Sequence, residues 1–427
     1  MTMKNILSSE LLEATRLTNA GRLTEATAAL QRMLSGQLAP ASTNPQPRRE
    51  PPTIDGVAEP AEAVGTKPAP QSGPAFGTGV GQRPLGSSGR PTSPPMPEAL
   101  RSFLDQASHG GFQLPGGPAH RSPTATPVAV PEGARFLAAS FSNPAGSRPY
   151  KLYVPSGYHG QPVPLIVMLH GCTQSPDDFA AGTRMNTAAE EHTCLVVYPG
   201  QIAAANPQKC WNWFSEADQQ REGGEPSLIA GITRQVMRDY AVDPQRVYVA
   251  GLSAGGAAAA VMGETYPDLY AAIGVHSGLA CGAARDVPSA TAAMRQGSGS
   301  TMHRRGGASR SEARRRVVPA IVFHGDRDST VNPRNGDEVV TQSARAATLR
   351  RHMQEGQIPG GHAYSRTLHV GADGRTVVEQ WVVHGAGHAW FGGSPAGSYT
   401  DPCGPDATQE MLRFFLEHPL STATQAG

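Results

Sequence analysis

Charge is scarce in this sequence and nearly balanced. Asp, Glu, Lys and Arg make up 17% of the 427 residues, and the formal net charge is +1. A chain with this balance offers no broad basic surface for nucleic acid. Its apolar runs are short, and none approaches the roughly 18 residues of a membrane-spanning helix. We therefore expect neither a nucleic-acid partner nor a transmembrane segment.

Cysteine is also scarce. The five cysteines have irregular spacing, which gives neither a metal-ligand pattern nor a disulfide framework. The first residues lack the unbroken apolar core of a secretory signal, because Glu10 and Glu13 interrupt it. On the sequence alone we expect no metal and a cytoplasmic protein.

Three segments of different composition divide the chain. Residues 1–35 carry Leu, Ala and Met at helical spacing and are expected to form a helical hairpin. One hairpin cannot bury its own apolar face, so residues 8–35 are expected to dock on an apolar surface or a second copy, or to be solvated without a partner. Residues 36–131, rich in Pro, Gly and Ser, are expected to be a disordered linker. Residues 132–420 are expected to form the folded domain.

Strand and helix patterns alternate through this domain. The continuous apolar runs are typical of strands buried on both faces, and helical patterns lie between them. The expected strands are 136–141, 150–154, 163–169, 194–198, 246–252, 272–276, 318–323 and 378–383, and the expected helices are 177–191, 228–240, 257–262 and 408–417. This alternation predicts an α/β fold with a mostly parallel sheet flanked by helices. The Arg-rich insertion at 297–316 is expected to be a surface loop.

A Gly-x-Ser-x-Gly motif stands between one of these strands and an Ala-rich helix. It places Ser253 in a sharp turn, where Gly251 and Gly255 are needed because a Cβ would clash. An ordinary glycine turn is the alternative in a chain with 49 glycines. The strand before the motif and the helix after it favour a nucleophilic Ser253.

A serine nucleophile needs a base, and the base needs an acid to orient it. Two later strands end in His-Gly-Asp-Arg-Asp-Ser-Thr-Val (324–331) and His-Gly-Ala-Gly-His (384–388). The resulting order of Ser, Asp and His is that of α/β-hydrolases. We assign Asp328 as the acid and His388 as the base. We expect Asp326 to stabilise a turn and His384 to be structural.

The oxyanion of a tetrahedral intermediate needs two backbone donors. The amide of Ala254 is one, and the loop at 170–174 places the amide of Cys172 as the other. Cys172 as the nucleophile is the rival interpretation, which Ser253 makes unnecessary. Trp211 and Trp213 either line a substrate cleft, Trp211 more than Trp213, or cap the core.

Five segments together carry a family resemblance: 170–174, 210–214, 251–256, 276–278 and 385–388. The region from 134 to 417 resembles the poly(3-hydroxybutyrate) depolymerase family of esterases. The resemblance implies an α/β-hydrolase fold and a triad of Ser253, His388 and Asp328. It also implies hydrolysis of short-chain polyhydroxyalkanoate or related esters without a cofactor.

Other consequences of the resemblance are less uniform. It implies an extracellular protein, in which Cys172 and Cys210 could form a disulfide, whereas a cytosolic protein keeps both reduced. If the protein is cytoplasmic, residues 8–35 are candidates for association with a polymer granule. Feruloyl and acetylxylan esterases share much of the pattern and are the first alternative. A non-catalytic binding protein of the same fold is the second.

Overall fold

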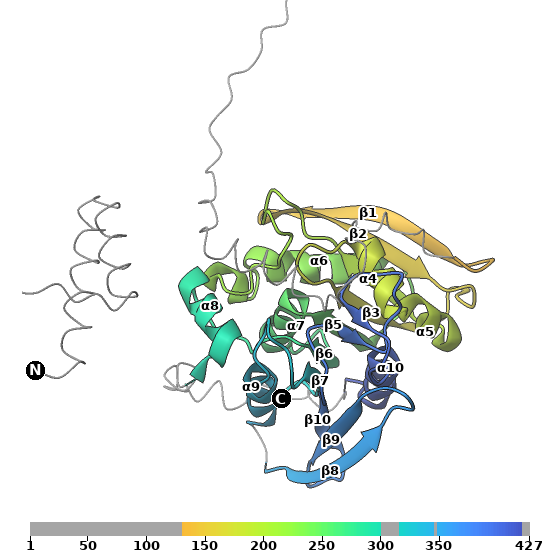
Figure 1. Ribbon diagram of the computed structural model, residues 1–427. Coiled ribbons are helices and arrows are strands. Elements are labelled where there is room, and N and C mark those ends of the chain that lie inside the picture. The colour runs from red at the N-terminus through yellow and green to blue at the C-terminus, as the bar shows by residue number, and fades with distance from the viewer. Residues whose placement is uncertain (1–129, 300–315, 346–347, 421–427) are drawn as a thin grey trace, which may run out of the picture. The chain divides into compact units, whose positions relative to one another are not determined.

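The computed structural model describes residues 130–299, 316–345 and 348–420. The expected hairpin at 1–35, nearly all of the expected linker at 36–131 and most of the insertion at 297–316 lie outside them. In the described part of the chain a ten-stranded sheet has the order β1-β2-β4-β3-β5-β6-β7-β10-β9-β8 (Figure 1). Its strands are β1 (Arg135–Asn143), β2 (Gly146–Val154), β3 (Val163–Leu169), β4 (Leu195–Pro199), β5 (Val242–Leu252), β6 (Ala272–His276), β7 (Ala320–Gly325), β8 (Arg350–Gln357), β9 (Ala363–Val370) and β10 (Thr376–Val383).

The middle of the sheet is parallel. Strands β4, β3, β5, β6, β7 and β10 run in one direction, and antiparallel strands extend both edges. Helices cover both faces: α4 (Pro176–Thr183), α5 (Met185–His192), α6 (Gly224–Asp239), α7 (Ala254–Thr265), α8 (Val287–Gln296), α9 (Arg334–Ala344) and α10 (Ala407–Glu417). The predicted α/β class and mostly parallel sheet are confirmed.

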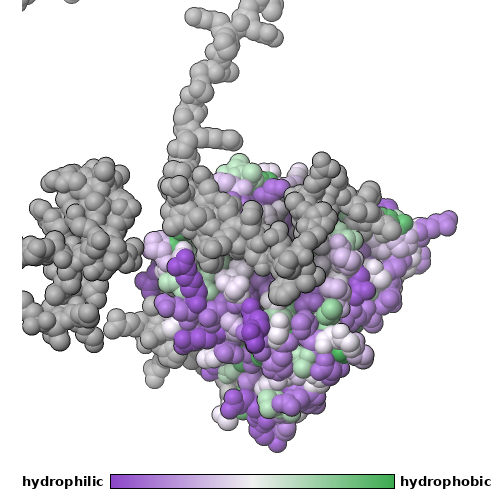
Figure 2. All heavy atoms as spheres, in the orientation of Figure 1, coloured by the Kyte–Doolittle hydropathy of each residue, from purple (hydrophilic) through white to green (hydrophobic). Residues whose placement is uncertain are grey.

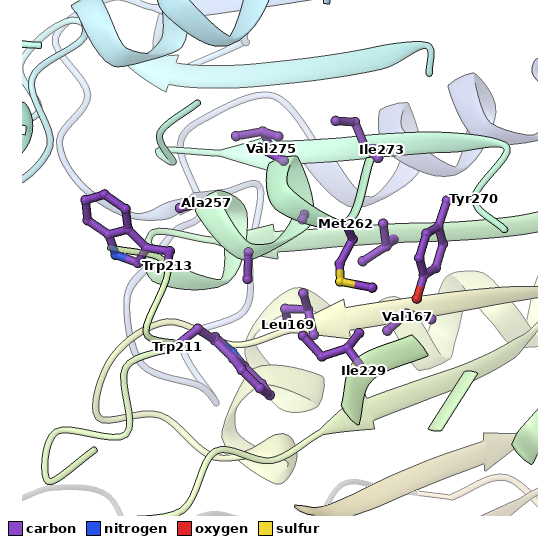
Figure 3. Close-up of a cluster of buried hydrophobic side chains, with 14 of the residues drawn as sticks. Val167, Leu169, Trp211, Trp213, Ile229, Ala257, Met262, Tyr270, Ile273 and Val275 are labelled. Atoms are coloured by element: carbon purple, nitrogen blue, oxygen red, sulfur yellow. The ribbon is translucent and has the colours of Figure 1, made fainter. Parts of the chain in front are cut away.

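Strand β3 shows why the apolar runs are continuous. All seven of its residues are buried, and alternate residues belong to two different cores. Val167 packs in the core that contains Ile229 of α6 and Met262 of α7 (Figure 3). Ile166 belongs to the core on the opposite face, with Phe415 of α10. A strand covered on both faces has no polar side, so its sequence shows no alternation.

The structure departs from the expected elements in several places. Residues 177–191, expected as one helix, form α4 and α5, because Arg184 adopts a left-handed conformation (φ 57°) between them. The sequence pattern does not predict β8, whose residues are nearly all exposed and therefore show no apolar alternation. It also misses α8 and a small sheet of β11 (Trp390–Phe391) and β12 (Thr400–Asp401) that follows β10.

The visible surface of the described domain is mostly hydrophilic (Figure 2). Among the described residues, the large hydrophobic side chains that are exposed are Val130, Leu137 and Met353. None of the described helices combines the length and apolar character needed to span a membrane.

Candidate active site

Ser253 lies in the turn between β5 and α7. Its backbone has φ 57° and ψ −119°, outside the regions that a side chain ordinarily allows. A Cβ added at Gly251 would lie 2.3 Å from the carbonyl carbon of Gly255, and one added at Gly255 would lie 2.0 Å from the oxygen of Leu169. Both positions therefore require glycine. The turn holds the serine at the carboxyl end of β5.

Asp328 and His388 follow β7 and β10, and the structure brings them together. Nδ1 of His388 lies 2.7 Å from Oδ2 of Asp328, while Oδ1 accepts the amides of Thr330 and Val331 at 2.9 and 2.8 Å. Burial alone raises the pKa of Asp328, but the imidazoles of His388 and His324 outweigh burial and hold this pKa below its ordinary range. An ionised Asp328 can orient His388 and stabilise its protonated form.

Hydrogen bonds tie the histidine loop to the strand next to Ser253. The Ser253 amide donates to the carbonyl of His276, at the end of β6, over 2.9 Å. Nε2 of His276 accepts the amide of Phe391, three residues beyond His388, over 3.1 Å. Burial keeps the pKa of His276 well below its ordinary value, so the ring stays neutral and can accept this bond. Ser253 and the His388 loop are therefore anchored to one residue.

A second set of the same residue types lies nearby on the surface. Oγ of Ser365 is 2.9 Å from Nε2 of His384, whose Nδ1 is 3.0 Å from Oδ2 of Asp326. The side chains of His384 and Asp326 are 43% and 38% exposed, whereas that of Asp328 is fully buried. Asp326 also accepts the amide of Gly385 over 2.7 Å, so it connects two loops.

This second set lacks the surroundings of a reactive serine. Ser365 lies within β9, which pairs with β10 on one side and β8 on the other. Backbone groups of such a strand belong to the sheet ladder and are not directed together at a developing oxyanion. Three residues in hydrogen-bond reach are therefore insufficient to define a catalytic centre.

The two expected oxyanion donors flank Ser253. Ala254 is the first residue of α7, so its amide has no acceptor within the helix. Cys172 lies in the loop after β3, next to Gly171. A Cβ added at Gly171 would be only 3.6 Å from the Cβ of Ser253. The loop that carries Cys172 therefore runs beside the serine.

This oxyanion loop, residues 170–174, is braced from two sides. A disulfide joins Cys172 to Cys210. The side chain of Gln174 accepts the amide of Gly171 over 2.9 Å and donates to Asp178 of α4 over 2.9 Å. The sequence motif contained Gln174, but its bracing role depends on a contact with α4 that no local pattern reveals.

His170 supplies a further brace. Its Nε2 accepts the amide of Gln201 over 3.0 Å, and its Nδ1 lies 2.7 Å from the carbonyl oxygen of Gly171. Burial lowers the pKa of His170 to about 4, which keeps the ring neutral at ordinary pH. The neutral ring with a proton on Nδ1 satisfies both contacts, because Nε2 must accept.

Glu225, at the start of α6, holds the segment on the other side of the disulfide. Its carboxylate accepts the amide of Asn212 over 2.7 Å and pairs with Arg148 over 3.2 Å. Burial and the charge of Asp218 raise the pKa of Glu225 to about 7. This role of Glu225 could not be predicted from the sequence, since acidic residues are common in the first turn of any helix.

Both tryptophans, which could have lined a substrate cleft, are buried. Trp211 is 0% exposed and packs against His170, with ring centroids 5.8 Å apart. It lies in the core with Leu169 and Ile229 (Figure 3). Trp213 is 6% exposed. A wall that binds substrate needs accessible ring area, so the structure does not support a cleft role for Trp211 and favours the alternative, a residue of the core.

The fold and this arrangement define a class of protein. Among the described residues, no group of three or more His, Cys, Asp or Glu side chains is placed to hold a metal ion. A parallel sheet with a serine in the turn after β5, an acid after β7 and a histidine after β10 is that of an α/β-hydrolase.

Comparison with known proteins identifies the family. The family model described as "Esterase PHB depolymerase" matches residues 148–352. The chain is 32% identical to poly(3-hydroxyalkanoate) depolymerase C of Paucimonas lemoignei over 62% of its length. It is 31% identical to a probable acetylxylan esterase A of Aspergillus flavus, over 47% of this chain and 67% of that protein. The chain belongs to the PHB depolymerase family of esterases.

Two further proteins are similar to this chain. The chain is 29% identical to feruloyl esterase B of Neurospora crassa, over 64% of this chain and 89% of that protein. The structure of an acetyl xylan esterase from Aspergillus awamori matches with a TM-score of 0.51 at 21% identity, over 66% of this chain and 99% of that one, which supports the fold. The match to the Paucimonas protein spans 63% of that protein's length.

Proposed function

We propose that this chain is a serine esterase that hydrolyses short-chain hydroxyalkanoate esters through an acyl-enzyme on Ser253. The observation that carries the proposal is the contact between the buried Asp328 and the half-buried His388, whose loop is anchored through His276 beside the strained turn of Ser253. The named relatives, a poly(3-hydroxyalkanoate) depolymerase among them, support an ester substrate.

The residues define each step of the reaction. His388 takes the proton of Ser253 as its Oγ attacks the ester carbonyl carbon, and Asp328 stabilises the resulting imidazolium. The amides of Cys172 and Ala254 bind the oxyanion. The alcohol then leaves with the proton held by His388. A water molecule, deprotonated by the same histidine, then attacks the acyl carbon. The bond to Oγ breaks, the acid is released, and His388 returns the proton to Ser253. Protein groups supply every proton transfer, so the mechanism requires no cofactor.

Labelling with a fluorophosphonate probe tests whether Ser253 is the nucleophile. It also distinguishes an esterase from a non-catalytic binding protein of the same fold. Wild-type protein and Ser365→Ala should each be labelled, and peptide mapping should find the probe on Ser253. Ser253→Ala should not be labelled. A probe found on Ser365 would contradict the assignment, and an unlabelled wild type would favour the non-catalytic alternative.

The second candidate is a carbohydrate esterase, because proteins named feruloyl and acetylxylan esterases are also similar to this chain. A panel of hydroxybutyrate oligomers, p-nitrophenyl esters, feruloylated sugars and acetylated xylan separates the two. We expect a higher kcat/KM for the hydroxybutyrate trimer than for a feruloylated sugar. The reverse order would assign the enzyme to the carbohydrate esterases.

We also propose that residues 8–35 attach the protein to a polymer granule or to a second copy. Their apolar residues at helical spacing, together with the scarcity of large exposed hydrophobic side chains on the described domain, support this proposal. Cosedimentation of the full chain with polyhydroxybutyrate granules, compared with a chain that lacks these residues, tests it.

A further inference from the structure

Tyr399 connects the two halves of the candidate active site. Its hydroxyl lies 3.2 Å from Oγ1 of Thr173, next to Cys172 in the oxyanion loop. Its carbonyl oxygen accepts the amide of Trp390, two residues beyond His388, over 2.7 Å. Tyr399 therefore lies between the oxyanion loop and the histidine loop.

Thr173 and Tyr399, whose hydroxyl groups form this contact, both have an unusual backbone conformation. Thr173 has φ 66° and Tyr399 has φ 53°, a left-handed conformation that is uncommon for a β-branched or bulky side chain. Such conformations persist only where surrounding structure imposes them, and they cluster at functional sites. Here hydrogen bonds that join Ser398, the neighbour of Tyr399, to Gln174 and Asp178 fix the backbone next to Tyr399.

The pair is also accessible. Thr173 is exposed and Tyr399 is half-buried, as are Ser253 and His388. Thr173 directly follows Cys172, and its hydroxyl contacts the carbonyl oxygen of Cys172, so the two hydroxyls adjoin the residue whose amide is proposed to hold the substrate's carbonyl oxygen.

The hydrogen-bond directions determine what the pair can recognise. The Thr173 hydroxyl donates to the carbonyl oxygen of Cys172 over 2.6 Å, because a carbonyl can only accept. A hydroxyl has one proton, so Thr173 must accept from Tyr399 in the contact between them. The Tyr399 proton is then engaged, and its oxygen is left with acceptor capacity only.

From this geometry we propose that the Tyr399 oxygen binds the free 3-hydroxyl group of a 3-hydroxyacyl ester, which donates to it. This inference deepens the proposed esterase function and rests on it. The site prefers an acyl unit with a free hydroxyl, the terminal unit of an oligomer, over a unit whose 3-oxygen is capped. Tyr399 is thus a specificity-determining residue.

Three matched esters test the proposal with the full-length protein: methyl 3-hydroxybutyrate, methyl 3-methoxybutyrate and methyl butyrate. The wild type should prefer the hydroxy over the methoxy ester, and Tyr399→Phe should lower the hydroxy-to-methoxy ratio of kcat/KM about three- to tenfold, the effect of one neutral hydrogen bond. The kcat/KM for methyl butyrate, which has no 3-oxygen, should fall less than that for the hydroxy ester. Tyr240→Phe, at the far end of α6, is the matched control and should leave all three values unaltered.

Variants of Thr173 test the direction of the hydrogen bonds. Thr173→Ala frees the Tyr399 proton to donate, so the methoxy ester should gain and the hydroxy-to-methoxy ratio should approach one. Thr173→Ser keeps the hydroxyl and should retain the wild-type ratio, which a merely structural role for this position does not predict.

The outcomes separate this inference from the proposed function. An enzyme that cleaves all three esters with ratios unaffected by Tyr399→Phe would overturn the role of Tyr399 and leave the esterase assignment intact. Equal losses on all three esters would make Tyr399 a structural residue and would also overturn it. A wild type that cleaves none of them, with Ser253 unlabelled, would overturn both proposals.

Discussion

At the scale of single residues, burial distinguishes Asp328 from Asp326. Each carboxylate contacts a histidine of the same loop at similar distance. Asp328 is fully buried and Asp326 is 38% exposed, so only Asp328 acts on its histidine in a medium of low dielectric constant, where electrostatic interactions are stronger. Substitutions at the two positions should therefore have very different effects.

The triad assignment predicts the size of these effects. Ser253→Ala and His388→Ala should each lower kcat on p-nitrophenyl butyrate by about 10⁶-fold, and the double variant little further, because the groups act as a unit. Asp328→Asn should cost about 10⁴-fold by stabilising the wrong tautomer of His388. Asp326→Asn should be mild. A crippled Asp326→Asn with an active Asp328→Asn would reverse the assignment of the acid.

The burial of Trp211 also leads to a prediction: removal of its side chain should lower the stability of the protein rather than its substrate selectivity. Trp211→Ala should destabilise the protein by about 3–5 kcal/mol through the cavity it leaves, measured by urea unfolding. Because the ring is not an accessible wall, the loss of activity should be the same for a hydroxybutyrate trimer and for p-nitrophenyl butyrate. A selective loss on the trimer would restore the cleft role.

At the scale of elements, the sequence predicts what depends on local pattern. The central strands, the Ser253 turn and the order of acid and base follow from apolar runs and from motifs at strand ends. Strand β8 is not predicted because its exposed residues carry no apolar period. The break between α4 and α5 is not predicted because its left-handed residue is Arg184 rather than the glycine that usually marks such a position. The contacts of Gln174 and Glu225 join distant segments, so no local pattern reports them.

The disulfide between Cys172 and Cys210 gives a prediction about the oxyanion loop. The two residues are 38 positions apart, and closing a loop of that length stabilises the fold by about 4 kcal/mol through chain entropy. The double variant Cys172→Ala/Cys210→Ala should lose up to this amount in urea unfolding. Its kcat should fall by up to about 10²-fold, as the oxyanion amide is less firmly placed. Cys403→Ala, at an exposed cysteine outside the disulfide, should change neither.

His170 gives this loop a pH dependence. The pKa of His170 is about 4 in the folded protein, below the ordinary value of 6.5, so the unfolded chain binds the proton more tightly. The stability that the neutral ring provides is complete above pH 6.5 and is lost as the pH falls from 6.5 towards 4, by about 3 kcal/mol at pH 4.5. The loss of unfolding free energy between pH 7.5 and 4.5 should therefore be smaller in His170→Asn by this amount. His159→Asn, at an exposed position, should keep the wild-type loss.

At the scale of the whole molecule, the residues proposed for catalysis and specificity all lie within the described domain. Strands β3, β5, β7 and β10 run in one direction, so the loops at their carboxyl ends bring Cys172, Ser253, Asp328 and His388 to the same side of the sheet. Two cores, one on each face, hold that sheet. We therefore expect hydrolysis of a small soluble ester to require nothing outside this domain. Attachment to a solid substrate needs an apolar surface, which the described residues supply only sparsely.

A fragment that starts at Pro131 separates these two requirements. It should fold and cleave p-nitrophenyl butyrate with a kcat/KM within about twofold of the full chain, since it retains the triad and both oxyanion amides. On granular polyhydroxybutyrate its rate should fall if residues 8–35 attach the protein to the polymer. Leu23→Ser and Leu30→Ser in the full chain should then reproduce the fall, because they remove apolar surface from that segment alone.

An insoluble fragment, or one inactive on p-nitrophenyl butyrate, would show that residues 1–130 belong to the folding unit. Unaltered granule hydrolysis by an active fragment would rule out the attachment role.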